Sequence, residues 1–283
     1  MNYDLVILDF DGTFTDVEKE AGPFFAAYRE DIRERLEVQD LDALWERCRE
    51  TLAKDPAHYG WSYEGKVVAP GNADPYLRAT VILNMILDER ELFSNVEERR
   101  QLLQELYHRN YPKADTVFRS DAKHVVEALL ASGLPTVVVT NSETAAVQAK
   151  IDVLNPTGRE RLRVCGDAKK YIVSELDEAD EVFDGVAAEM KVEGLRRPIL
   201  LRRGHYYTQL RSLWNELSAT PERTLVVGDI FELDLALPAQ LGASTHLVLK
   251  EMTEAFERSA VEATERSELS EGLGAVLARV GIA

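Results

Sequence analysis

The sequence predicts an α/β protein in which a doubly wound parallel sheet carries an inserted α-helical domain. From residue 121 onward, short apolar runs alternate with amphipathic segments of helical spacing, which is typical of parallel strands covered by helices on both faces. Residues 16–115, in contrast, show helical spacing over most of their length. A chain of 283 residues, 45% hydrophobic and 29% charged, is long enough for one large core and a smaller inserted domain.

The first predicted strand is the apolar run Leu5–Leu8, and two acids, Asp9 and Asp11, stand just beyond its end. Gly12 comes next and relaxes the backbone, so that a side chain and a carbonyl can face the same side of a turn. Such an arrangement of oxygens can hold a divalent cation. The alternative is ordinary Asp-Gly turn chemistry, which requires no cation.

Residues 16–115 are expected to form the helical insertion. The expected helices run from about Pro23 to Leu36, from Leu41 to Leu52, from Tyr76 to Phe93 and from Val96 to Tyr107. Between the second and third of them lies a loop, His58–Pro75, that is rich in tyrosine and tryptophan. This loop either faces a substrate or folds back on the helices. The predicted domains are therefore the core, residues 1–15 and 116–283, and a helical cap, residues 16–115.

The α/β core continues with a helix that Asp121 is expected to cap and Gly133 to end. The next expected strands are 136–139, 162–165, 225–227 and 245–249, and the expected helices between them are 143–154 and 206–217. Residues 171–197 lose clear periodicity and carry an acidic run, so we expect an irregular excursion or a hairpin there. A final helix around 269–277 is expected to pack on the core.

Polar residues directly follow three of the predicted strands. Asp9 follows the first strand, Thr140 follows the second, and Asp229 follows a later one, with Asp234 five positions further on. Ligands of open parallel sheets bind beyond the carboxyl ends of the strands, so we expect Asp9, Thr140 and Asp229 to converge on one crevice. Carboxylates gathered at one point repel one another unless a cation neutralises them, and an all-oxygen set suits magnesium.

The order of these motifs resembles that of the haloacid dehalogenase-like hydrolase superfamily. The set is Asp9-Phe10-Asp11-Gly12-Thr13, then Thr140-Asn141, then Gly228-Asp229-Ile230-Phe231-Glu232-Leu233-Asp234, each after an apolar strand. The resemblance extends from Tyr3 to about Leu249. It implies a Rossmann-like core with a helical cap between the first two motifs, and a magnesium-dependent phosphatase that acts on a small phosphorylated metabolite.

The resemblance also implies roles for the acids. Magnesium would be held by the Asp9 carboxylate, the Asp11 backbone carbonyl and the Asp229 carboxylate. Asp9 would attack phosphorus and form an aspartyl-phosphate, which divides one difficult displacement into two easier ones. Asp11 would protonate the leaving oxygen and later take a proton from water.

Three further residues are expected to complete the site around the phosphoryl group. Thr140 and Asn141 would donate hydrogen bonds to its oxygens from a hydroxyl and an amide, although Thr-Asn-Ser also fits a simple helix N-cap. Asp234 would support the metal site, or it would cap the helix that follows Gly228.

The catalytic cation of the resembling enzymes is normally a lysine that precedes the helix leading to the last motif. Here the sequence departs from the common form, because the equivalent stretch reads Leu201-Arg202-Arg203-Gly204-His205. A lysine pair, Lys169-Lys170, lies further upstream. We favour Arg203 for this role, then Arg202, then Lys170; a guanidinium could grip two phosphoryl oxygens, whereas lysine acts as a point charge.

Composition excludes some classes of partner. Fifty acidic residues against 33 basic ones give a formal net charge of −17, which argues against nucleic acid or an anionic membrane as a partner. The two cysteines, Cys48 and Cys165, stand in unrelated contexts and are expected to be free thiols. No leader segment precedes the first strand, so a cytoplasmic location is expected.

Other functions remain compatible with the motif set. A phosphomutase would transfer the phosphoryl group to a sugar hydroxyl instead of water. A phosphonate hydrolase would need a cap lysine for a Schiff base, for which Lys54 and Lys66 are available. A binding module would keep the fold without turnover. A dehalogenase is disfavoured, because the resembling dehalogenases need no general acid at the position of Asp11. Neither the substrate nor the oligomeric state can be read from the sequence.

Overall fold

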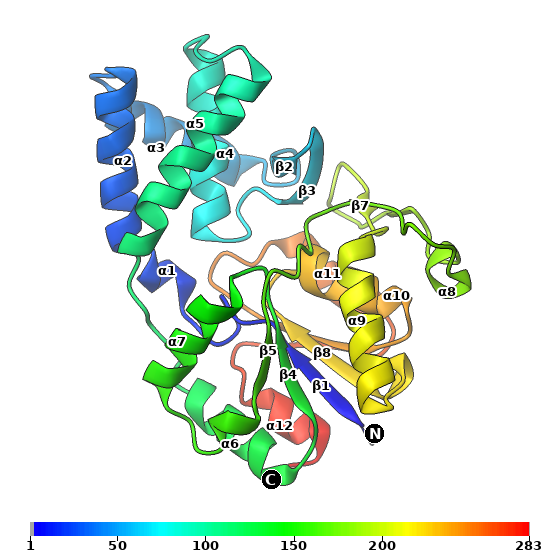
Figure 1. Ribbon diagram of the computed structural model, residues 1–283. Helices are drawn as coiled ribbons and strands as arrows, with labels where there is room; N and C mark the ends of the chain where they lie inside the picture. The colour runs from blue at the N-terminus through cyan, green and yellow to red at the C-terminus, as the bar shows by residue number, and fades with distance from the viewer. Residues whose placement is uncertain (1–2, 283) are drawn as a thin grey trace.

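The computed structural model describes residues 3–282, and its centre is a six-stranded, all-parallel sheet (Figure 1). The strand order is β10-β9-β8-β1-β4-β5, which places β1 between β8 and β4. The strands are β1 Leu5–Leu8, β4 Thr136–Val139, β5 Arg163–Cys165, β8 Thr224–Gly228, β9 Ser244–Val248 and β10 Ser267–Ser270. The predicted α/β fold class is therefore confirmed.

Helices cover both faces of this sheet. Alternate residues of β1 enter two different apolar cores: Leu5 and Ile7 pack with α9, whereas Val6 and Leu8 pack with α6 and α12. The helices of this part of the chain are α6 Ala122–Ser132, α7 Thr144–Leu154, α9 Gly204–Leu217, α10 Ala236–Gln240, α11 Ala255–Ala263 and α12 Ala275–Val280. Burial of β1 on both faces explains why its sequence is apolar without alternation.

The helical insertion, residues 16–115, has an apolar core of its own, in which Tyr28 and Trp45 are buried. Figure 1 shows its helices, coloured from blue through cyan to green, grouped on one side of the sheet. They are α1 Val17–Glu20, α2 Gly22–Leu36, α3 Leu41–Lys54, α4 Pro75–Glu89 and α5 Val96–Asn110. The four expected long helices are present. The domain boundaries at residues 15/16 and 115/116 stay a prediction.

The expectation of a loop at residues 58–75 was wrong in part. The structure forms an antiparallel hairpin there, β2 Gly60–Tyr63 and β3 Lys66–Pro70. The aromatic rings on β2 contact the α/β core: the ring of Tyr171 lies 5.4 Å from that of Trp61 and 4.9 Å from that of Tyr63, measured between centroids. These residues therefore join the insertion to the core segment that follows β5.

Several smaller expectations also change. Gly133 ends α6 in the left-handed region at φ +77°, as predicted, but Asp121 makes no side-chain cap there. Its carboxylate instead accepts a hydrogen bond of 2.8 Å from the amide of Gly274. Residues 171–197 contain the short helix α8 Glu181–Asp184 and β6 Glu189–Met190, which pairs with β7 Ile199–Leu200. Strand β10 and helix α11 were not predicted.

Candidate active site

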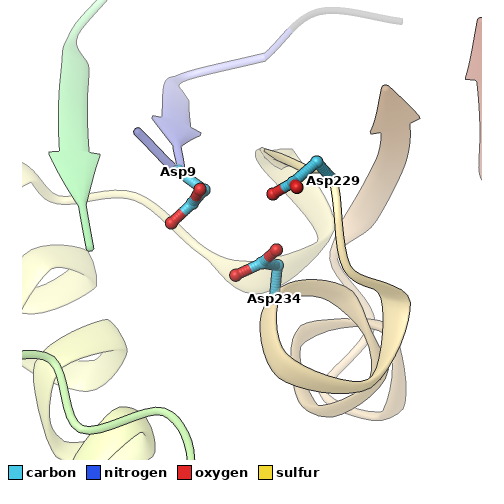
Figure 2. Close-up of side chains that lie close together, drawn as sticks. All are labelled: Asp9, Asp229 and Asp234. Atoms are coloured by element: carbon cyan, nitrogen blue, oxygen red, sulfur yellow. The ribbon is translucent and has the colours of Figure 1, made fainter. Parts of the chain in front are cut away.

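Three buried aspartates meet at the carboxyl edge of the sheet. Asp9 directly follows β1, Asp229 directly follows the neighbouring β8, and Asp234 lies in the π-helical turn η4 Phe231–Leu235. One carboxylate oxygen from each lies within 4.8 Å of the others, and Figure 2 shows the three groups facing a common point. The register of β1 and β8, with Leu8 opposite Val227, brings the two strand ends together.

Asp9 occupies the centre of the site. It is 8% exposed, and burial raises the pKa of its carboxyl well above the usual range, with the charges of Asp234 and Asp229 adding to that effect. Opposing this, the Lys170 ammonium lies 2.7 Å from Asp9 Oδ1. The Thr13 hydroxyl lies 3.4 Å from the other oxygen, Oδ2. The carboxylate is thus held in one orientation by the lysine.

Lys170 is the cation that contacts the nucleophile candidate. It stands in the loop after β5, is 1% exposed, and bridges Asp9 to Asp234 at 2.7 and 2.8 Å. Burial works against its charge, but Asp234 and Asp9 outweigh that effect and raise its pKa. The side-chain carbonyl of Asn141 accepts a hydrogen bond of 2.8 Å from the Lys170 amide, which fixes the backbone here.

Arg203, the first choice for that cation, is bonded to groups other than Asp9. Arg203 is 1% exposed, yet its guanidinium donates to the backbone carbonyls of Leu200, Lys170 and Val68 at 2.9, 2.6 and 3.0 Å. Its guanidinium also pairs with Glu232, at 3.4 Å, and burial lowers the pKa of Arg203 to about 10. Each of its three nitrogens donates to one of these acceptors, so Arg203 joins backbone segments instead of reaching Asp9.

Arg202, the second choice, points away from the site. Its guanidinium bonds the Glu175 carboxylate at 3.0 Å and the carbonyls of Val186 and Asp184 at 3.1 and 3.0 Å. These groups belong to the excursion at residues 171–197. The third choice, Lys170, is therefore the one that the fold brings to Asp9.

Asp229 has the surroundings of a cation ligand. It is 1% exposed, burial raises its pKa to about 6, and within the described residues 3–282 its Oδ1 has no hydrogen-bond partner. Gly12, at φ +84°, leaves the space for this carboxylate: a Cβ at that position would lie 2.1 Å from Asp229 Oδ2. An unpartnered buried oxygen amid carboxylates fits a hard divalent cation.

Asp11 lies apart from the three-aspartate cluster. Its Oδ2 accepts a hydrogen bond of 2.6 Å from the Ser142 hydroxyl, and its Oδ1 lies 3.1 Å from Lys150 Nζ on α7. Lys150 also lies 3.5 Å from Glu20, which is fully buried where the insertion begins. The structure therefore holds Asp11 against α7, one quarter exposed.

Thr140 and Asn141 take the positions expected from the end of β4. Thr140 is 1% exposed, and its hydroxyl accepts a hydrogen bond of 3.2 Å from the Ser142 amide. Because Asn141 uses its carbonyl oxygen to hold Lys170, its amide NH₂ is the group left to donate. The residue at the N-cap position of α7 is Glu143, so Thr-Asn-Ser does not itself cap that helix.

Two lysines of the site were not predicted. Lys150 could not be found by the search for strand ends, because it lies within a helix. Lys250 could have been found by that search, because it comes two residues after β9, the neighbour of β8. Its ammonium lies 2.5 Å from Asp229 Oδ2.

The fold thus gathers three buried aspartates and Lys170 at the carboxyl edge of a parallel sheet, and comparison with protein families identifies the class of protein as a hydrolase. The family model for haloacid dehalogenase-like hydrolases matches residues 3–242, and the chain belongs to that family. No curated protein matches the sequence. Within residues 3–282, no helix combines the length and the apolar character needed to cross a membrane.

Solved structures of low sequence identity share the fold. A predicted phosphoglycolate phosphatase from Haemophilus somnus 129pt has a TM-score of 0.57 at 12% identity, covering 99% of this chain and 98% of its own. A HAD family hydrolase from Deinococcus radiodurans R1, with bound phosphate and sodium, has a TM-score of 0.51 at 16% identity and coverages of 99% and 96%. The HAD-hydrolase YfnB from Bacillus subtilis, bound to magnesium, has a TM-score of 0.50 at 14% identity and covers both chains fully.

Proposed function

We propose that this hydrolase is a magnesium-dependent phosphatase of small phosphomonoesters that works through an aspartyl-phosphate on Asp9. The observation that carries the proposal is the buried Asp9 carboxylate, held by Lys170 beside Asp229 and Asp234. A nucleophilic carboxylate, an adjacent cation and a set of cation-binding oxygens are the groups that phosphoryl transfer requires. The phosphate bound to the Deinococcus radiodurans relative and the magnesium bound to the Bacillus subtilis relative support it.

The Asp9 and Asp229 carboxylates and the Asp11 backbone carbonyl would hold the magnesium ion. When bound, the ion neutralises the acidic cluster and draws electron density from the phosphoryl oxygens. The unpartnered Oδ1 of Asp229 supports this assignment. Asp234 has a different task, because its Oδ1 pairs with Lys170 and its Oδ2 accepts the Ile230 amide at 3.0 Å. It positions the lysine.

In the proposed first step, a carboxylate oxygen of Asp9 bonds to phosphorus while the bond to the leaving oxygen breaks. Lys170 stabilises the charge of the equatorial oxygens, together with the Thr140 hydroxyl and the Asn141 amide. Lys170 therefore takes the place that Arg203 was expected to fill. Arg203 holds the Lys170 carbonyl and so fixes the loop from which the lysine reaches the site.

Asp11 would donate a proton to the leaving oxygen and accept one from the water that cleaves the aspartyl-phosphate. Its hydrogen bond to Ser142 and its ion pair with Lys150 hold the carboxylate away from the cluster of Asp9, Asp229 and Asp234. For proton transfer, rotation of the side chain would exchange these partners for the substrate. Lys150 and Ser142 therefore define the resting position of the acid.

The test is hydrolysis of an aryl phosphate by the purified protein, with and without Mg²⁺, for wild type and Asp9→Asn. We expect turnover that requires both the ion and Asp9. Asp152→Asn is the matched control, since Asp152 is an exposed acid on α7, and it should behave as wild type. If Asp9→Asn retains wild-type turnover, the assigned nucleophile is wrong. If wild type shows no turnover, beryllium fluoride is used as a probe of Asp9, and failure of the adduct to form contradicts the proposal.

A further inference from the structure

The ammonium of Lys250 contacts the carboxylate of Asp229, which is expected to hold the metal. Because Leu247 on β9 pairs with Gly228 on β8, the segment beyond β9 emerges next to Asp229. The Lys250 side chain is only 5% exposed, and its Nζ lies 2.5 Å from Asp229 Oδ2. The same ammonium donates a hydrogen bond to the backbone carbonyl of Ala73, in the helical insertion. One buried lysine thus joins the metal site to the other part of the molecule.

The two buried lysines divide the acidic cluster between them. Lys170 pairs with Asp9 and Asp234, whereas Lys250 pairs with Asp229. A divalent cation on Asp229 would place its charge beside the ammonium of Lys250, and the two would repel each other in a site of low dielectric. The cation and Lys250 would also share the carboxylate of Asp229. Lys250 is therefore a competitor for the ligand as well as a neutralising charge.

Ala73 belongs to a short loop that lies between the hairpin and α4. Two hydrogen bonds attach this loop, residues 71–74, to the core: one from Lys250 to Ala73, and one of 3.0 Å from Asn72 to Glu254. The Ala73 side chain also packs with Ile230 and Leu233. Within the loop, the Ala73 amide bonds the carbonyl of Pro70 at 3.2 Å. A change in the position of Lys250 would thus remove one of the two attachments.

We propose that Lys250 occupies Asp229 until a divalent cation replaces it, and that this replacement removes one of the two hydrogen bonds that attach the 71–74 loop to the core. The inference rests on the proposed metal site. It assigns to Lys250 a positioning role that is separate from phosphoryl transfer, in which metal loading and the attachment of the helical insertion are coupled. The chain would bind the ion more weakly than its carboxylates alone would allow.

The first test is calorimetric titration of the protein with MgCl₂, for wild type, Lys250→Met, Lys250→Arg and Lys123→Met. Lys250→Met should bind Mg²⁺ about tenfold more tightly, since the competing charged hydrogen bond is gone. Lys250→Arg keeps the positive charge, so its Mg²⁺ affinity should lie closer to that of wild type than the affinity of Lys250→Met does. Lys123 is exposed on α6, so Lys123→Met controls for the change in net charge and should equal wild type.

The second test needs only the wild-type protein, so it stands even where Lys250→Met fails to fold. Hydrogen exchange of the Gly71 and Ala73 amides is measured with and without Mg²⁺, and we expect the ion to accelerate it. Unchanged or slower exchange overturns the link to the loop. Equal or weaker Mg²⁺ affinity in a folded Lys250→Met overturns the competition while leaving the metal site intact. If no variant binds Mg²⁺, the proposed metal site itself fails, and the inference fails with it.

Discussion

Replacement of Lys170 by methionine separates the role of this lysine from that of Arg203. Methionine keeps the length and the apolar stem of the side chain and removes the ammonium. The loss takes away both short contacts of Nζ, at 2.7 Å from Asp9 and 2.8 Å from Asp234. Because the site is buried, water does not replace them, and two carboxylates are left without their common cation.

The expected magnitude follows from this geometry. Removing one preorganised stabilising group from a water-excluded site lowers kcat by about 10²–10³-fold. Breaking a buried ion pair from one side costs about 3–5 kcal/mol of the free energy of unfolding. Arg203→Lys should show the opposite balance. This variant loses hydrogen bonds to backbone carbonyls, which should lower the free energy of unfolding by about 3 kcal/mol in total. It leaves the Lys170 ammonium in place.

The assay is the rate of aryl phosphate hydrolysis at saturating Mg²⁺, together with urea unfolding of each variant. Both variants are compared at a urea-free condition where circular dichroism shows them folded. Retention of more than about a tenth of the wild-type kcat by Lys170→Met would refute the reasoning, since no preorganised group would then have been lost. So would a loss of kcat in folded Arg203→Lys that equals the loss in Lys170→Met.

Three other predictions concern the surroundings of the site. Gly12→Ala should lower the free energy of unfolding by about 1–2 kcal/mol, because alanine disfavours the positive φ of this position. It should also weaken Mg²⁺ binding in calorimetry, because the methyl carbon would stand 2.1 Å from Asp229 Oδ2, and wild-type affinity would contradict this. Burial lowers the pKa of His246 to about 4, so between pH 6.5 and 4 the unfolded chain binds a proton that the folded chain does not. Through this residue, the unfolding free energy of wild type should fall by about 2 kcal/mol from pH 7 to pH 5. His246→Gln should lack that part of the fall in urea titrations, and an equal pH dependence in the two proteins would contradict the prediction. Tyr171→Ala should remove a ring contact with Trp61 worth about 0.5–1.5 kcal/mol and should accelerate amide exchange across the hairpin. Exchange equal to that of wild type would show that this contact does not stabilise the hairpin.

The sequence was sufficient for the parts of the site that follow strands directly. The predicted placement of Asp9, Thr140 and Asp229 at one edge depends only on parallel pairing and on where each apolar run stops. The lysine that contacts Asp9 could not be identified from the sequence in the same way. Lys169 and Lys170 are adjacent and chemically identical, yet the first is exposed and the second is buried. Only the path of the loop after β5 decides which of them turns inward.

The parts of the fold that were missed also have physical reasons. Strand β10 reads Ser267-Glu268-Leu269-Ser270, which is too polar to indicate a strand, and it forms because it pairs with the edge of β9. The hairpin at residues 60–70 contains Gly60, Gly65 and Pro70, which favour turns, and its pairing is supported by the rings around Tyr171. In both cases long-range pairing outweighs the local preference of the residues.

The central position of β1 determines when the cluster of Asp9, Asp229 and Asp234 can form during synthesis. Its neighbours in the sheet are β4 and β8, so the strand that leads to Asp9 stays without its second partner until the ribosome has passed residue 228. Asp9 and Lys170 are separated by 161 positions in the chain. The helical insertion, in contrast, buries a core made from residues 17–106 alone. The insertion can therefore fold before β1 has both of its partner strands. In the sequence it lies between β1 and the part of the chain that is synthesised later.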